Sequence, residues 1–119
     1  MGHSVLIVDD HPSFRASARV LLESEGFEVV GEAPDGASAV IETCRLHPEV
    51  VLLDVGLPDC DGFDVCARLC GHRNGAWPAI ILVSSRDASD FGPLVTRSGA
   101  RGFVPKAELS GERLEALLS

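Results

Sequence analysis

The chain has 119 residues, with 18 acidic against 10 basic side chains, so its formal net charge at neutral pH is −8. This length predicts one domain, 1–119, with a core large enough to fold without disulfides or a structural metal, and a hydrophobic content of 45% excludes wholesale disorder. The acidic balance argues against direct binding of nucleic acid or of an anionic membrane, because both require a basic surface.

Short apolar runs alternate with longer amphipathic segments along the chain, and Gly or Pro stands at the joints. The runs of strand length are, in chain order, 4–8, 27–32, 50–53, 79–83 and 102–104. The segments with helical spacing are 12–25, 36–44, 62–69, 95–98 and a last helix that Ser110 caps. The sequence therefore predicts five units of one strand and one helix.

The third and fourth of these helices have distinctive patterns. In the helix at 62–69, the side chains expected to face the core are Phe63, Ala67 and Cys70. Before the helix at 95–98, Gly92 and Pro93 interrupt the pattern, since Gly costs about 1 kcal/mol and Pro about 3 kcal/mol inside a helix. We expect this helix to be short or to begin late. Our hypothesis is that segment 87–95 is mobile; the alternative is that the proline marks a first helical turn.

Alternating strands and helices predict an α/β fold, a doubly wound five-stranded parallel sheet of order 2-1-3-4-5 with helices on both faces, as in flavodoxin. Parallel strands need crossover connections, and the helices supply them. The apolar runs are uninterrupted, as expected for strands buried on both faces. In such folds ligands bind at the carboxyl ends of the strands, next to the switch point between the first and third strands.

Polar side chains follow four of the predicted strands. Asp9 and Asp10 follow the first strand, Asp54 the third, Ser84 the fourth and Lys106 the fifth. If the first and third strands are neighbours, the three aspartates converge, and their repulsion requires a cation. Mg²⁺ fits, because it accepts carboxylates and keeps coordination sites for phosphate oxygens. With the lysine and the serine hydroxyl, the set predicts a phosphate-handling site. The alternative is ordinary polar strand ends, with Asp10 only capping the first helix.

The cysteines raise the alternative of a zinc site. They are Cys44, Cys60, Cys66 and Cys70, and His72 follows the last of them closely. Structural zinc sites usually contain two pairs of ligands with two- to four-residue gaps, and the sequence has no second pair. We therefore expect thiols that bind no metal.

Four stretches of the chain resemble the receiver domain of bacterial response regulators, the phosphoacceptors of two-component signalling. They are the acidic pair at 9–10, the stretch LDVGLPDCDG at 53–62, the strand end VSS at 83–85 and the stretch GARGFVPK at 99–106. The resemblance covers essentially the whole chain. It implies that Asp54 accepts a phosphoryl group from a sensor histidine kinase in a Mg²⁺-dependent reaction. The domain would assist this reaction without being an enzyme in the usual sense.

The resemblance also implies roles for other residues. The implied ligands of Mg²⁺ are Asp9, Asp10, Asp54 and the backbone carbonyl of Gly56. Lys106 would pair with the phosphate, and Ser84 would bind a phosphoryl oxygen. Ser84 and Phe103 would then switch the face formed by the fourth helix, the fifth strand and the fifth helix, through which a homodimer is a family-level expectation.

The end of the chain resembles receivers that precede a helix-turn-helix domain, through the stretch KAELS at 106–110. The resemblance implies control of transcription through an output domain outside this chain.

We expect a cytoplasmic protein with no membrane partner, since the apolar run at 5–8 is too short for a signal peptide or a membrane span.

Two residues depart from the common family pattern. Pro105 precedes Lys106 instead of a proline following it, so the isomer of the Lys106–Ala107 peptide stays open. The switch aromatic is Phe103, and the chain contains no Tyr, so ring burial alone must report the phosphorylated state.

Two residues are weaker candidates for the site. His11 is expected to face solvent beside the acidic pair, and Arg86 is placed to influence the access of water to a phosphorylated Asp54.

Two other functions compete with this interpretation. A small-molecule phosphatase or phosphotransferase with an aspartate nucleophile would need a second aspartate two residues after it and an inserted cap domain. Position 56 is Gly, and the sequence has no insertion. A receiver-like binding module that no longer takes phosphate would be expected to lose the acidic pair, the acceptor or the lysine, and all of them are present.

Overall fold

The computed structural model describes residues 2–71, 78–86 and 88–118. Its strands are β1 (Ser4–Val8), β2 (Glu28–Ala33), β3 (Val50–Asp54), β4 (Ala79–Ser84) and β5 (Gly102–Pro105). Its helices are α1 (Pro12–Ser24), α2 (Gly36–Leu46), α3 (Gly62–Gly71), α4 (Leu94–Arg97) and α5 (Gly111–Leu118), with 3₁₀ turns η1 (Ala88–Asp90) and η2 (Lys106–Glu108). Every predicted strand and helix is present, and its ends lie close to the predicted ones.

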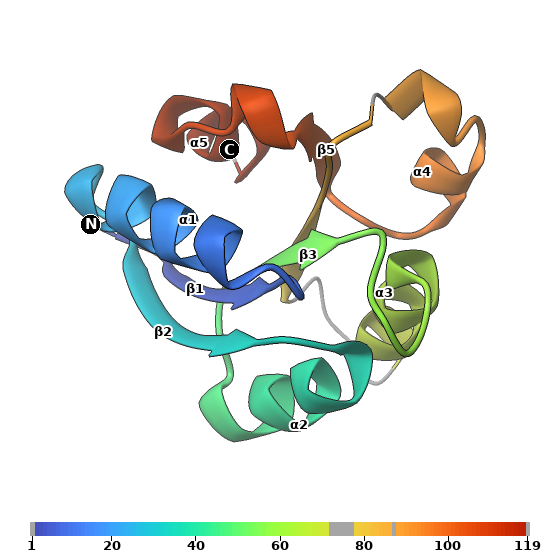
Figure 1. Ribbon diagram of the computed structural model, residues 1–119, viewed down its shortest axis with the longest axis horizontal. Helices are drawn as coiled ribbons and strands as arrows, with labels where there is room; N and C mark the ends of the chain where they lie inside the picture. Colours follow the sequence, from blue (N-terminus) through green and yellow to red (C-terminus); the bar gives the residue numbers. More distant parts are fainter. Residues whose placement is uncertain (1, 72–77, 87, 119) are drawn as a thin grey trace.

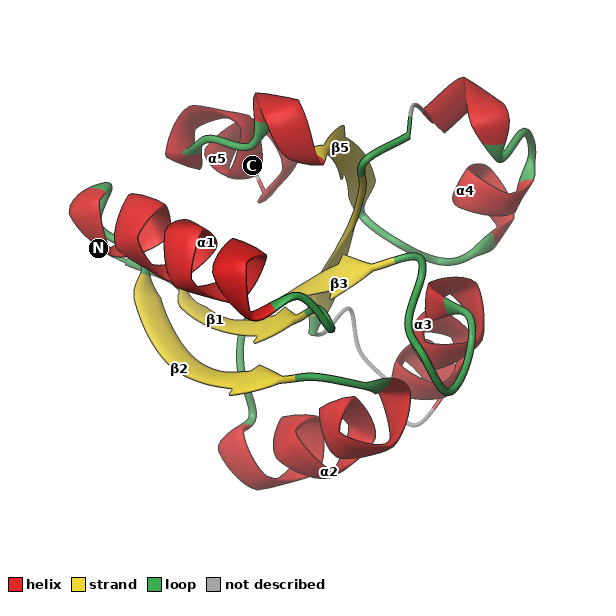
Figure 2. Ribbon diagram, viewed as in Figure 1, coloured by secondary structure: helices red, strands yellow, loops and turns green. Residues whose placement is uncertain are grey.

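The five strands form one parallel sheet in the order β2-β1-β3-β4-β5, as the sequence predicts. Figure 1 shows α1 and α5 on one face of this sheet and α2 and α3 on the other. Figure 2 gives the same view and shows that loops emerge from the strand ends. Among the described residues, no helix is long and apolar enough to cross a bilayer.

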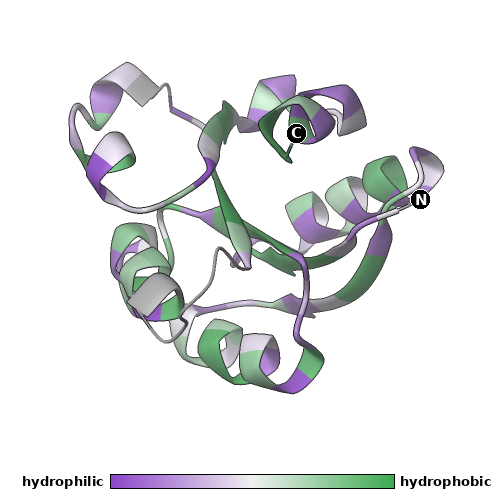
Figure 3. Cartoon of the chain, turned by 180° about the vertical axis from the view of Figure 1, so that it is seen from behind, coloured by the Kyte–Doolittle hydropathy of each residue, from purple (hydrophilic) through white to green (hydrophobic). Residues whose placement is uncertain are grey.

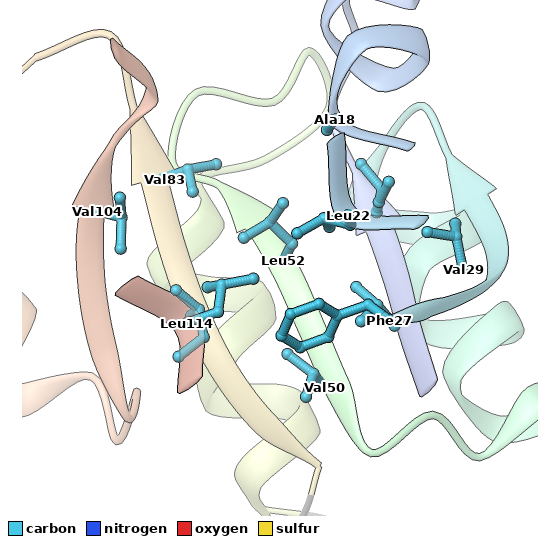
Figure 4. Packing of buried hydrophobic residues seen from close by; sticks show 12 residues of the cluster. Ala18, Leu22, Phe27, Val29, Val50, Leu52, Val83, Val104 and Leu114 are labelled. Carbon is cyan, nitrogen blue, oxygen red and sulfur yellow. The ribbon is translucent and has the colours of Figure 1, made fainter. Parts of the chain in front are cut away.

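The core has two halves, one on each face of the sheet, because successive residues of a strand point to opposite faces. Val5 and Ile7 of β1 face α1 and α5, together with Leu22 and Leu114, and part of this cluster is seen in Figure 4. Leu6 and Val8 belong to the other cluster, under α2 and α3. Figure 3 shows the hydrophobic colour on stretches of the strands and of the helices that cover them. The sheet is therefore a rigid platform that fixes the positions of its strand ends.

The predicted inward face of helix α3 is correct for Phe63, which packs against the core, and wrong for Ala67. Its buried side chains are Val65, Cys66 and Leu69, whereas Ala67 is exposed; Phe63 is half-buried, and the side chain of Cys70 lies outside the described part. Gly62 begins the helix against the end of β3, where a Cβ would clash with the carbonyl oxygen of Asp54. The spacing of apolar residues does not reveal this close approach, which restricts how the helix can pack.

The connection from β4 to β5 contains the short helix that Gly92 and Pro93 predict. Gly92 has a positive φ of 59°, which breaks the chain direction after η1, and Pro93 is the N-cap residue of α4. The helix has 4 residues, and none of them is buried. The expectation of a short helix that begins late is confirmed. The hypothesis of a mobile segment stays a prediction, and Asp87, at its start, lies outside the described residues.

Candidate phosphate and metal site

The candidate site lies where the central strands end. The order of the sheet places the exits of β1, β3, β4 and β5 side by side, so their terminal polar residues meet. A pocket of about 230 Å³ opens there. Its lining residues are His11, Asp54, Val55, Gly56, Ser84, Ser85, Arg86, Phe91 and Lys106. Five of the residues that the sequence singles out for their side chains therefore line one pocket together with Gly56: His11, Asp54, Ser84, Arg86 and Lys106.

Three aspartates converge beside this pocket, as predicted. Asp9 and Asp54 are buried and Asp10 is half-buried. One side-chain oxygen from each of them and a ring nitrogen of His11 lie within 4.8 Å of one another. Among the described residues, this is the one such group of metal-ligating side chains, and it contains no cysteine. Cys66 instead donates its thiol to the Ser98 carbonyl, and His72 lies outside the described part.

Lys106 is the cation of the cluster. Its Nζ lies 2.6 Å from Asp9 Oδ2 and 3.4 Å from Asp54 Oδ2. Its ammonium also lies 4.5 Å from the centroid of the Phe14 ring on α1, a cation–π contact. The lysine thus bridges two of the three carboxylates, and one positive charge faces three acidic groups.

Burial raises the pKa of the Asp54 carboxyl above its usual range. The negative charge of Asp9 acts in the same direction, while the backbone N–H of Gly56 and the ammonium of Lys106 oppose the shift. The Gly56 N–H donates to Asp54 Oδ1 at 3.1 Å. The net direction is upward, so burial and the charge of Asp9 outweigh these two donors.

The donor set fits a hard divalent cation such as Mg²⁺. Asp9 Oδ2 and Asp10 Oδ1 are buried, and the groups that face them are Lys106 Nζ, 2.6 Å from Asp9 Oδ2, and His11 Nδ1, 3.1 Å from Asp10 Oδ1. Carboxylate oxygens are the ligands that Mg²⁺ prefers. Three carboxylates that converge in one cluster supply such oxygens, so the residues present fit the metal that the sequence predicts.

The loop after β3 is held in place at both of its ends. Gly62 N–H donates to the Val55 carbonyl at 2.7 Å, which closes the loop next to Asp54. The Asp59 carboxylate accepts from Gly36 N at 2.8 Å and from Ala37 N at 3.0 Å, at the beginning of α2. These contacts fix the backbone that carries Gly56.

The acidic loop after β1 has its own support, which the sequence analysis missed. Arg15 of α1 donates from Nη1 to the Asp9 carbonyl at 2.6 Å and from Nε to Glu32 of β2 at 3.0 Å. Glu32 also accepts from Arg19, and this bond lowers the pKa of Glu32. Nothing in the local sequence pattern distinguishes these charges from ordinary surface charges, because their partners are on other elements.

Ser84 lines the pocket itself, and Phe103 is linked to it through Phe91. Ser84 is buried, and its Oγ accepts from the backbone N–H of Arg86 at 3.0 Å. The Phe91 ring lies 5.7 Å from the Phe103 ring and 5.6 Å from the Phe63 ring, centroid to centroid. The Arg86 guanidinium lies 5.5 Å from the centroid of the Phe91 ring. Phe91 is a second residue that the sequence analysis missed, since its pattern is that of an ordinary loop residue.

Comparisons with known proteins agree with this geometry. The response regulator receiver domain model matches residues 5–118. The chain is 40% identical over 114 residues to the nitrate/nitrite response regulator NarP of Escherichia coli, covering 95% of this chain and 52% of NarP. It is 34% identical over 105 residues to the E. coli DNA-binding transcriptional activator EvgA, covering 88% and 50%. The chain thus spans about half the length of the curated relatives it matches.

A solved structure shares the whole fold. The two-component response regulator of the LuxR family from Aurantimonas sp. SI85-9A1 superposes with a TM-score of 0.88 at 30% identity, covering 99% of this chain and 86% of that one. The predicted flavodoxin-like sheet order is therefore confirmed by the topology and by this neighbour.

Proposed function

The chain belongs to the response regulator receiver domain family, and on that premise we propose that Asp54 accepts a phosphoryl group from a sensor histidine kinase. One observation carries the proposal. The Asp54 carboxylate lies in a pocket at the end of the central strand, with Lys106 and an acidic pair beside it. Nucleophile, cation and metal-binding oxygens together are what transfer of a phosphoryl group to a carboxylate requires.

The step is a displacement at phosphorus. An oxygen of Asp54 forms a bond to phosphorus while the bond from phosphorus to the donor's histidine nitrogen breaks, and that nitrogen keeps the electron pair. Lys106 and the Ser84 hydroxyl would stabilise the charge on the phosphoryl oxygens, since both groups line the pocket. Asp9, Asp10, Asp54 and the carbonyl of Gly56 would hold Mg²⁺. The ion, when bound, supplies positive charge to the phosphoryl oxygens.

The change would leave the site through the switch residues. Movement of Ser84 toward a phosphoryl oxygen alters the space beside Phe91, which contacts Phe103. Phe103 belongs to β5, at the edge of the sheet, and α4 next to it exposes Leu94. These features support a response at the face made of α4, β5 and α5, including homodimerisation there.

The proposal treats the domain as a signalling component that assists its own phosphorylation and slow dephosphorylation, and not as an enzyme with a released product. Its half-length match to NarP and EvgA supports an output domain that controls transcription. A sensor kinase takes its phosphoryl group from ATP, which is a cytoplasmic substrate. A domain that receives this group would therefore act in the cytoplasm.

Incubation with Mg²⁺ and a small phosphodonor such as acetyl phosphate tests the proposal by intact mass. We expect one added phosphate in the wild type and in Asp64→Asn, which changes an exposed carboxylate of α3 outside the pocket, and none in Asp54→Asn. Omission of Mg²⁺ should abolish the adduct. An adduct that survives Asp54→Asn, or no adduct in the wild type, contradicts the assignment.

A further inference from the structure

His11 contacts the acidic pair in a way that the proposed Mg²⁺ chemistry does not use. Its Nδ1 lies at hydrogen-bond distance from Asp9 Oδ1, 3.1 Å, and also 3.1 Å from Asp10 Oδ1. Two ligand atoms that bind one divalent cation at about 2.1 Å, at right angles, lie roughly 3 Å apart. The ring nitrogen is thus at the separation expected for neighbouring ligands of one ion.

The ring is also free of a role in the helix that it precedes. His11 is the N-cap residue of α1, and its side chain makes no capping hydrogen bond. Its backbone N–H donates to Asp9 Oδ1 at 2.8 Å, which fixes the residue beside the cluster. The ring lines the same pocket as Asp54. The position of the ring and its access to the pocket are therefore those that a ligand requires.

We propose that Nδ1 of His11 is a nitrogen ligand of the cation that Asp9 and Asp10 bind, so that the site also takes imidazole-preferring divalent ions such as Co²⁺ and Zn²⁺. This inference rests on the proposed function, because it concerns the same cation site. The chemistry follows from ligand preference. Mg²⁺ selects oxygen and gains little from an imidazole, whereas Co²⁺ and Zn²⁺ bind imidazole nitrogen well.

A competing interpretation is that His11 acts only as a positive counter-ion to the two aspartates. The two interpretations predict opposite changes in the affinity for Co²⁺ when His11 is removed. Removal of a counter-ion leaves the site more negative and strengthens the binding of Mg²⁺ and Co²⁺ alike. Removal of a nitrogen ligand weakens the binding of Co²⁺ and leaves that of Mg²⁺ nearly unchanged.

Calorimetric titration of the full chain with Co²⁺ and with Mg²⁺, without a phosphodonor, separates these outcomes. We expect His11→Ala to raise the Kd for Co²⁺ about tenfold and to change the Kd for Mg²⁺ by less than about threefold. The matched control is His47→Asn, which removes another exposed imidazole. His47 has a φ of 50°, and asparagine tolerates this left-handed conformation. The control should leave both constants unchanged.

Parallel shifts of the two constants in either direction, or the same loss in His47→Asn, overturn the inference. A readout on the wild type does not depend on the folding of a variant. The Co²⁺ complex should show paramagnetically shifted imidazole protons in its ¹H NMR spectrum, and their absence also overturns it. If Mg²⁺ binds and Asp54 is phosphorylated while Co²⁺ ignores His11, only this inference fails. If the wild type binds no Mg²⁺, both this inference and the proposed function fail.

Discussion

Asp54 carries a charge that burial makes unfavourable in the folded chain. Its raised pKa means that the folded state binds the proton more tightly than the unfolded state does. The stability associated with that proton is fully present below the unfolded pKa, and it is lost as the pH rises through the higher folded pKa. The ionised form of Asp54, which the reaction needs, is therefore the form that lowers the stability of the folded chain.

Asp54→Asn should therefore stabilise the protein when divalent cations are removed. With EDTA at neutral pH we expect the free energy of unfolding to rise on the order of 1 kcal/mol. The gain should shrink as the pH falls toward the unfolded pKa of aspartate. Urea denaturation across this pH range measures it. A variant less stable than the wild type at neutral pH would show that the pairing of Asp54 with Lys106 outweighs its desolvation.

Asp59→Asn is the control with the opposite sign. The N–H of Gly36 lowers the pKa of Asp59, so its charge stabilises the fold above the unfolded pKa, and this stability is lost as the pH falls through the folded pKa. The variant should be less stable than the wild type at neutral pH, and the difference should vanish in acid. The same sign for both variants contradicts the argument.

Lys106 offsets part of the repulsion among the aspartates. Its removal should therefore lower the free energy of unfolding. Lys106→Met should lower the free energy of unfolding by about 3 kcal/mol in EDTA, because a buried ion pair loses one partner. Mg²⁺ should then stabilise the variant more than the wild type, since the lysine no longer competes for Asp9 Oδ2. Melting temperatures with and without Mg²⁺ test this. Equal shifts in the two proteins contradict it.

At the scale of elements, the connection that contains η1 and α4 has the weakest anchoring among the described helices. No side chain of α4 is buried, and Leu94 is 49% exposed. Helix α3 has Val65, Cys66 and Leu69 in the core. Local opening is cheapest where little apolar surface must be exposed. This helix is therefore suited to respond to the site, provided that Phe91 transmits the change.

Hydrogen exchange tests this unequal anchoring. Amides in segment 88–97 should exchange faster than those of α3, and a phosphate mimic bound with Mg²⁺ should slow them. The segment between Asp35 and Leu46 serves as the internal reference, because its helix is capped by Asp35 and should not respond. Equal protection of 88–97 and α3, or no change with the mimic, would contradict the prediction.

For the whole molecule, the architecture could be predicted from the sequence better than the side-chain contacts between different elements. Strands that alternate with helices, together with apolar runs that require burial on both faces, lead to the parallel sheet and to the convergence of Asp9 and Asp54. The support by Arg15 and the contacts of Phe91 involve elements far apart in sequence. No local pattern encodes them. The inward face of α3 was predicted only in part, since the prediction placed Ala67 in the core and did not include the contact between Gly62 and the end of β3.

The net charge of −8 leads to a last prediction, at the scale of the whole chain. DNA phosphates repel an acidic surface, and non-specific affinity comes almost entirely from basic side chains. Phosphorylation of Asp54 would add further negative charge. The relative EvgA is named DNA-binding, and this chain matches about half of it, so we expect binding to reside in the unmatched half. Fluorescence anisotropy with duplex DNA at about 0.1 M salt should show no binding, with or without the phosphate mimic. A salt-dependent Kd in the micromolar range would instead place a DNA-binding surface on this domain.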